Sequence, residues 1–280
     1  MRASRVLTFA RYEIRRAVAR KKVLALVALT VLISTAPYYA LYATHTSLVT
    51  PPLRPYLWVL GVFLPQAFFL QFTALLIAAG SMSEEYEQGT AEVLLSKPVS
   101  REEYFFGKYL GGYVLVVGIV ILDVVLSISS ATFVFGPQQQ LDVEPTILVA
   151  QVFAALVFYS FAFMVGELMR RSSLSYILSA SVFFTSEVVG VFLNILYSLT
   201  GTDVYKVANY YLPTSPVDSL PLLLAEPKFP SSVQLVFRFA ATPVEPSIVV
   251  SALLIAVYFL SAVLIALAYF SGMDVAKRVT

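Results

Sequence analysis

Two acidic residues in long apolar runs, Asp123 and Glu187, are the residues whose positions most directly suggest chemistry. A carboxylate in the middle of a hydrocarbon layer costs ~2.5 kcal/mol or more, so we expect both side chains to face other helices or water. Thr185, Ser186 and Asn194 give the stretch around Glu187 a polar stripe. We predict a translocation path or substrate contact formed by Glu187, Asp123 and Asn194; the alternative is that these groups form interhelical hydrogen bonds that hold a bundle together.

Covalent catalysis has little support in the sequence. The chain has no cysteine and one histidine, His45, which lies in a loop. Adjacent Glu84 and Glu85 superficially resemble the glutamate pair of some intramembrane proteases, but those enzymes need histidines in the membrane, as do Ser–His dyads. An ion-coupled secondary transporter using Asp123 and Glu187 is a further alternative, although no internal repeat is visible. We predict no catalytic residue, metal site or cofactor site on this chain.

The elements that position these residues are membrane helices. With 59% hydrophobic residues, 13% charged residues and a mean hydropathy of +0.80, the chain has too few polar side chains to cover a soluble globule of 280 residues. A helix of ~20 apolar residues crosses the ~30 Å hydrocarbon core of a bilayer. We predict an all-α integral membrane protein, a single transmembrane domain over residues 1–280, with six transmembrane helices at about 23–43, 56–79, 109–135, 147–168, 174–199 and 247–270.

Basic residues predict the orientation. Eight Arg and Lys residues fall within residues 1–22, whereas the loop after the first span holds only Arg54. The positive-inside rule therefore places both termini in the cytoplasm, as expected for a multi-pass protein of the plasma membrane. A cleaved signal peptide is the competing interpretation, but the apolar core is too long and no clear cleavage site follows. Apolar residues at three- and four-residue spacing also predict an amphipathic interfacial helix over residues 1–22.

One polar stretch, residues 83–108, interrupts the apolar segments between the second and third spans. Glu84, Glu85 and Glu87 are expected to extend the second helix beyond the membrane. Gly89 interrupts that helix, and Thr90 is expected to cap a short new one.

The short helix is followed by a second helix start. Its Leu94 and Leu95 must be buried against the bundle or against another protein, and Pro98 ends it. Ser100, followed three residues later by Glu103, forms a capping box that begins the next helix. The stretch is therefore predicted to fold as a helix, a short apolar-faced helix and another helix.

This stretch resembles the permease subunits of type-2 ABC transporters, which include drug and polysaccharide exporters and the permease for nitrous oxide reductase maturation. That family has a stretch that reads approximately Glu, basic, Glu, any, Gly, Thr, then Leu-Leu, Pro-Val-Ser-Arg and Lys. The matching residues of this chain are Glu85, Glu87, Gly89, Thr90, Glu92, Leu94, Leu95, Pro98, Val99, Ser100, Arg101 and Lys108. Tyr86 stands where a basic residue is usual, and Lys97 where a small or hydroxyl residue is common.

The resemblance implies a coupling helix that is received by a separate ATP-binding subunit. The residues it assigns to ATPase coupling are Glu85, Glu87, Gly89, Thr90, Glu92, Leu94, Leu95, Pro98 and Arg101. Because the chain lacks a G-x-x-x-x-G-K-S/T phosphate loop, ATP and Mg²⁺ would bind to the partner ATPase. The resemblance implies a transporter with twice as many membrane helices as the six on this chain, so a second permease copy or paralogue is expected. It also implies export as the direction of transport. The chain is expected to contact the lipid bilayer and not nucleic acid.

The segment 200–246 is the longest stretch predicted to lie outside. It contains seven prolines, yet residues such as Leu220, Leu222 and Phe237 are too apolar for free solvent. Short re-entrant or interfacial helices before the last span are therefore predicted, and the resemblance implies that they close the outer mouth. A proline-rich lid without a gating role is the alternative.

Overall fold

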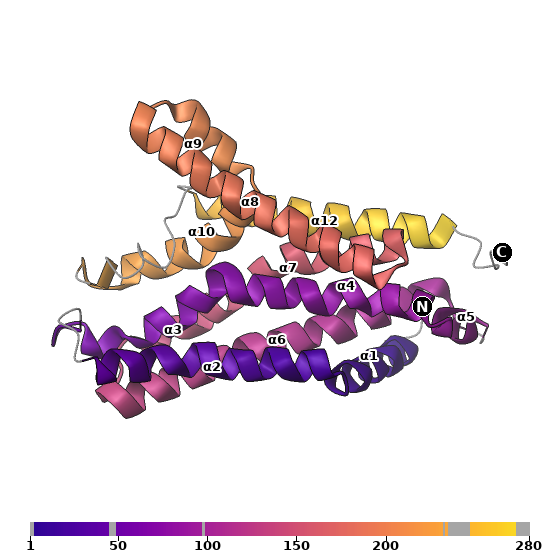
Figure 1. The fold of residues 1–280 in the computed structure, drawn as a ribbon, viewed down its shortest axis with the longest axis horizontal. Helices are drawn as coiled ribbons and strands as arrows, with labels where there is room; N and C mark the ends of the chain where they lie inside the picture. Colours follow the sequence, from indigo (N-terminus) through magenta and orange to yellow (C-terminus); the bar gives the residue numbers. More distant parts are fainter. Residues whose placement is uncertain (1–2, 45–48, 97–98, 232, 235–246, 273–280) are drawn as a thin grey trace.

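The computed structural model describes residues 3–44, 49–96, 99–231, 233–234 and 247–272, and helix is the only regular secondary structure in those ranges. Six of its helical segments are long and apolar enough to cross a membrane, which confirms the predicted all-α fold with six spans. They form one elongated bundle (Figure 1). His45, Pro98 and Phe237 lie outside the described residues.

The first half of the chain supplies three spans. Helix α1 precedes the first span, α2; the second span is built from α3, the π-helical turn η2 and α4; the short α5 leads to the third span, α6. Their bounds are α1 Ala3–Val18, α2 Lys21–Ala43, η1 Arg54–Tyr56, α3 Trp58–Pro65, η2 Gln66–Leu70, α4 Gln71–Glu87, α5 Thr90–Leu95 and α6 Arg101–Phe135.

The second half supplies the other three spans, α7, α8 and α12. Between α8 and α12 lie two shorter helices, α9 and α10, in the segment where short helices are predicted. The bounds are η3 Leu141–Val143, α7 Glu144–Met169, α8 Ser172–Thr200, α9 Asp203–Tyr210, α10 Thr214–Ala225, η4 Glu226–Lys228 and α12 Ile248–Gly272.

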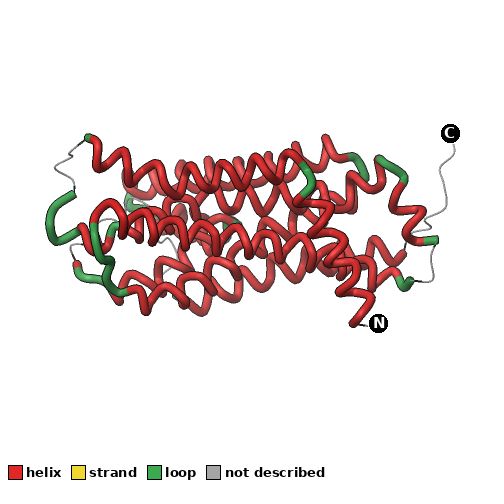
Figure 2. Tube along the Cα trace, turned by 90° about the horizontal axis from the view of Figure 1, so that it is seen from below, coloured by secondary structure: helices red, strands yellow, loops and turns green. Residues whose placement is uncertain are grey.

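The long helices run along a common axis, and most described loops lie at the two ends of the bundle (Figure 2). Helices α1 and α5 lie at one end, the α5 end, whereas α3 and α9 lie at the other, the α9 end (Figure 1). The two ends therefore carry different elements: the polar stretch of residues 83–108 is at the α5 end, and the segment after α8 is at the α9 end.

The core is centred on α4 and α7, whose facing surfaces are rich in alanine. Ala74 and Ala78 of α4 and Ala154 and Ala162 of α7 have no exposed surface. Small side chains let helix backbones approach closely, which is how helices pack where no water drives them together. By contrast, α2, α8 and α12 each leave an apolar face exposed; Val188 on α8, for example, is 67% exposed.

Helix α10 packs against α7 and α12 instead of extending into solvent. Val217, Leu220 and Leu222 on α10 are all buried. Their burial explains why this proline-containing segment can be so apolar, because its leucines lie against the bundle. Residues 235–246, which follow, lie outside the described ranges.

Candidate coupling site and membrane carboxylates

The polar stretch turns sharply at Gly89. Helix α4 continues through Glu87, and Gly89 then adopts a left-handed conformation with φ of 67° before α5 begins at Thr90. A side chain at this φ would be strained, so glycine suits the position. The predicted capping role of Thr90 is wrong: Gly89 is the N-cap residue, and the Thr90 hydroxyl donates to the backbone oxygen of Glu85 at 3.4 Å.

Helix α5 directs one apolar side chain outward. Val93 is 63% exposed, and Glu92 beside it is exposed as well. Leu94 and Leu95 are half-buried and pack against the core of the bundle. Of the two predicted fates for this apolar face, the leucines therefore follow the first, burial against their own bundle, which leaves Val93 as the outward contact.

The start of α6 is fixed by the predicted capping box. Ser100 Oγ accepts from the backbone N–H of Glu103 at 3.2 Å, and Glu103 Oε2 accepts from the backbone N–H of Ser100 at 3.2 Å. Arg101 donates to the backbone oxygens of Phe270 and Ser271 at 3.4 and 3.1 Å, at the end of α12. The first turn of α6 is therefore tied both to itself and to the last span.

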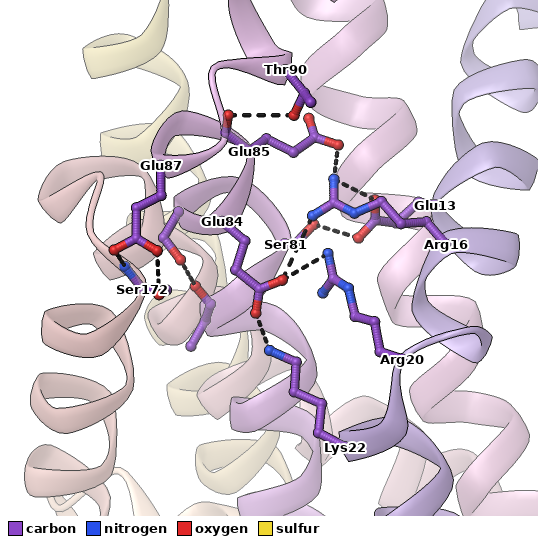
Figure 3. Close-up of polar contacts among 12 residues, drawn as sticks. Glu13, Arg16, Arg20, Lys22, Ser81, Glu84, Glu85, Glu87, Thr90 and Ser172 are labelled. Atoms are coloured by element: carbon purple, nitrogen blue, oxygen red, sulfur yellow. Dashed lines mark hydrogen bonds and ion pairs between the residues drawn. The ribbon is translucent and has the colours of Figure 1, made fainter.

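A cluster of charged side chains lies at the end of α4, close to Thr90 at the start of α5 (Figure 3). We call it the charged cluster; its members are Glu13, Arg16, Arg20, Lys22, Glu84, Glu85 and Lys108. At its centre Lys108 has no exposed surface and donates to Glu85 Oε1 at 2.8 Å and to Glu13. Tyr104 also donates to Glu85.

The outer part of the charged cluster surrounds Glu84. Arg20 lies 3.0 Å from Glu84 Oε2, and Lys22 pairs with the same carboxylate. The hydroxyl of Tyr176 on α8 donates to Glu84 Oε1 at 2.8 Å. Arg16 bridges the two parts, because its guanidinium pairs with Glu85 and lies 3.9 Å from Glu84.

The charged cluster joins α1, α2, α4 and α6 at the root of α5. Burying a charge costs several kcal/mol unless an opposite charge and hydrogen bonds compensate it. Here Glu13 also accepts from Ser81 Oγ at 3.0 Å, so the central carboxylates each have more than one partner. Movement of the α4–α5–α6 segment would have to carry α1 with it or break these pairs.

Sequence reasoning missed Glu13, the partner that brings α1 into the charged cluster. One signal was available: Glu13 is the only acid in the basic α1 segment, and it falls on the same face as the buried Val6, Ala10 and Ala17. An acid on the apolar face of a helix needs a buried partner. That partner, Lys108, is on α6.

Two further side chains of the stretch connect α4 to α7 and α8. Glu87 accepts from the backbone N–H and the hydroxyl of Ser172, at 2.9 and 2.5 Å, at the start of α8. Tyr86, which stands where the resembled family has a basic residue, donates to the buried Glu167 at 2.7 Å. The hydroxyl thus binds a carboxylate, as a basic side chain would.

Asp123 faces the protein interior, in contact with α2. It has no exposed surface, and Ser34 Oγ donates to its Oδ1 at 2.5 Å. Asp123 Oδ2 is shielded and has no hydrogen-bond partner among the described residues. This geometry matches the interhelical hydrogen bond that was the alternative to a path for Asp123.

Glu187 and Asn194 lie on α8 and contact the two short helices of the α9 end. Asn209 on α9 donates to Asn194 Oδ1 at 3.0 Å. Asp218 on α10 is an acid that sequence reasoning missed; burial, and then the charge of the Glu187 carboxylate, raise the pKa of Asp218. Asp123 contacts α2, so the structure gives the three predicted path residues different partners instead of bringing them together.

Comparison with known proteins agrees with this architecture. A family model described as "ABC-2 family transporter protein" matches residues 7–275, nearly the whole chain. No curated protein matches the chain. Six candidate spans, the polar stretch of residues 83–108 that contains α5, and the extent of that match lead to one conclusion: the chain belongs to the ABC-2 transporter family and is a multi-pass membrane permease component.

Proposed function

We propose that this chain couples ATP hydrolysis by a separate ATPase subunit to the export of a substrate across the plasma membrane. The observation that carries the proposal is α5: a six-residue helix at the end of the bundle that directs Val93 outward and lies in the chain between α4 and α6, which the charged cluster joins to α1 and α2. In this proposal Val93 and the exposed Glu92 beside it are the α5 side chains that contact the partner protein.

The charged cluster supports a mechanical role for α5. In the chain, α5 follows α4 and precedes α6, so a force on α5 acts on the second and third spans at once. Lys108 on α6 pairs with Glu85 on α4, and both pair with residues of α1, so the push is shared among these elements and not absorbed in a loop. Closure of an ATPase dimer would then tilt the bundle as a unit.

In this proposal the α5 end is cytoplasmic, and so are both chain termini. Exposed apolar faces on α2, α8 and α12 are available for contact with a second permease copy or paralogue, as well as with lipid. Asn194 lies beside α9, on the side that would be the exit, and Glu187 lies at the middle of α8. ATP and Mg²⁺ would be bound by the partner ATPase.

Site-specific photo-cross-linking tests the partnership. A photoreactive amino acid at Val93 in native membranes should capture a protein that mass spectrometry identifies as an ATPase with a phosphate loop. The matched control is Val204, 69% exposed on α9 at the other end of the bundle, which should capture no ATPase. Capture of such an ATPase from Val204 but not from Val93 would contradict the proposed coupling role of α5.

A further inference from the structure

A cavity of about 260 Å³ lies between α7, α8 and α12; we call it the aromatic cavity, because the rings of Phe158 and Tyr258 are among its walls. Phe158 is 1% exposed and makes an edge-to-face contact with Phe183 of α8, with ring centroids 4.9 Å apart, so this wall is fixed by packing. A second cavity of about 330 Å³ shares Val182 and Pro213 with the first. The space therefore continues along α8 and is elongated.

The two hydroxyl groups that line the aromatic cavity donate their hydrogen bonds within the protein. Tyr258 donates to the backbone oxygen of Tyr211, and Ser261 Oγ donates to the backbone oxygen of Tyr258 at 2.9 Å. The other lining side chains are apolar, and none is charged. A buried water is typically held by about three hydrogen bonds, which these walls do not supply. Since unfilled space also forfeits the packing contacts of the atoms around it, the cavity suits an apolar occupant.

The aromatic cavity lies at the depth of one leaflet of a bilayer. The contacts of Tyr86, Glu87 and Arg101 hold the end of α7, the start of α8 and the end of α12 at the α5 end. At 1.5 Å per residue, Met164 lies about 8 Å and Tyr258 about 21 Å from those helix ends. One leaflet contributes about half of the ~30 Å hydrocarbon core. The walls of the cavity therefore span the depth at which the lipid tails of the leaflet at the α5 end lie.

The aromatic cavity also borders an outward face of the bundle. Ile265 of α12 is 51% exposed and Val182 of α8 is 38% exposed, whereas Ala262, another lining residue, is 4% exposed. Exposed apolar side chains on membrane spans meet lipid tails, which are as apolar as leucine. A lipid tail that passes this face can thus reach buried residues without crossing a polar group.

We propose that the aromatic cavity binds one hydrocarbon chain of a membrane phospholipid from the leaflet at the α5 end. The chain lies between α12 and the α7–α8 pair and contacts Phe158 and Ala262, while its headgroup stays at the membrane surface. The elongated space favours a flexible chain over a compact side chain from a second copy of the protein. The proposal does not rest on the proposed function, because it requires only that these three helices span a membrane.

Photo-cross-linking from the lipid tests the site. The purified chain is placed in nanodiscs of phosphatidylcholine that include a phosphatidylcholine with a diazirine on one acyl chain, and adducts are located by mass spectrometry after illumination. We expect adducts on Phe158 and Ala262, which bulk lipid does not touch. Ala154, equally buried on α7 but lining neither cavity, should carry none. A phosphatidylcholine with the diazirine in its headgroup should label none of the three.

Two variants that fill the aromatic cavity provide a second test. Ser261→Phe and Ala262→Leu add bulk from adjacent lining positions and should each lower the adduct yield on Phe158 at least tenfold. Ser198→Phe is the matched control, because Ser198 is an exposed serine on α8 that lines neither cavity, and it should leave the yield unchanged. Fluorescence of the single tryptophan, Trp58, checks that each variant is folded.

Three results would overturn the proposal. The first is a wild type without adducts on Phe158 and Ala262; if its particles contain two chains, a second copy covers this face instead of lipid. The second is an undiminished yield on Phe158 in a folded filling variant. The third is equal labelling of Ala154, which would show that the probe reaches buried residues without the cavity. The nanodiscs contain no ATPase, so failure here leaves the cross-linking test at Val93 unaffected.

Discussion

Replacing Lys108 with methionine should destabilise the folded protein by about 3 kcal/mol, at the lower end of the 3–5 kcal/mol typical when one partner of a buried ion pair is removed. Lys108 and Glu85 have no exposed side-chain surface, and Glu13 has 2%. The variant would leave two buried carboxylates without their shared cation. Arg16 still pairs with Glu85, which is why we expect the lower end of the range.

The matched control is Lys22→Met, which removes a cation from the outer part of the same charged cluster. The Lys22 side chain is 42% exposed, and Glu84 keeps Arg20 and Tyr176 as partners. An exposed pair contributes ~1 kcal/mol or less, so the control should change the free energy of unfolding by no more than that. The two variants differ chiefly in the burial of the charge that they remove.

Denaturant unfolding in a mild detergent can measure both values through the fluorescence of Trp58, the only tryptophan, whose side chain has no exposed surface. Thiol-reactive dyes are unsuitable, because the chain has no cysteine. Adding Glu13→Gln to Lys108→Met should restore part of the lost stability, since one uncompensated charge is removed. Equal free energies of unfolding for Lys108→Met and Lys22→Met would refute the reasoning that burial makes the centre of the charged cluster decisive.

Three further predictions test the membrane topology, the packing of α1 against α6 and the protonation of Asp218 on α10. A membrane-impermeant thiol probe on intact cells should label Ser231→Cys at once but Ser96→Cys only after permeabilisation, and the opposite order would invert the proposed topology. Gly111→Ala should destabilise the protein by ~1–3 kcal/mol, because its Cβ would lie 2.7 Å from a backbone oxygen of α1, whereas Gly118→Ala, with nothing within 4 Å, should not. Asp218→Asn should raise the melting temperature more at pH 8 than at pH 5. The pKa of Asp218 is higher in the folded state than the value of about 4 expected in the unfolded state, so the wild type is most stable below pH 4 and loses stability as the pH rises through the folded-state pKa. An equal shift at both pH values would show that the carboxylate carries no such penalty.

Composition and hydropathy were sufficient to predict the six spans, because a helix that crosses hydrocarbon must be apolar along its whole length. The limits of the helices were less predictable. Helix α6 begins at Arg101 and not near residue 109, because its first two turns lie beyond the apolar run and are fixed by the Ser100 cap. The capping box at Ser100 predicted this start from the sequence and is confirmed, whereas the apolar run begins only near residue 109.

For the candidate sites too, features set by neighbouring residues were predictable, and contacts between distant helices were not. The short helix of residues 90–95 could be predicted from neighbouring residues, but the direction of its side chains could not, because that depends on the core against which Leu94 and Leu95 pack. The pairs Glu13–Lys108 and Glu187–Asp218 join helices far apart in the chain. Without knowledge of which helices are neighbours, an isolated acid in an apolar run indicates that a partner is needed and not which residue it is.

The π-helical turn η2, Gln66–Leu70, has a consequence for chain length. A π turn holds one residue more than the α-helical turn it replaces, so it is equivalent to a single-residue insertion in the second span. Deleting one residue there would restore an ordinary α-helix while keeping α3 and α4 on their present faces. A one-residue deletion elsewhere in α4 would rotate every following side chain by about 100° and turn Glu85 away from Lys108. The second span can therefore lose one residue at η2 without moving the charged cluster, whereas loss of one residue within α4 would move it.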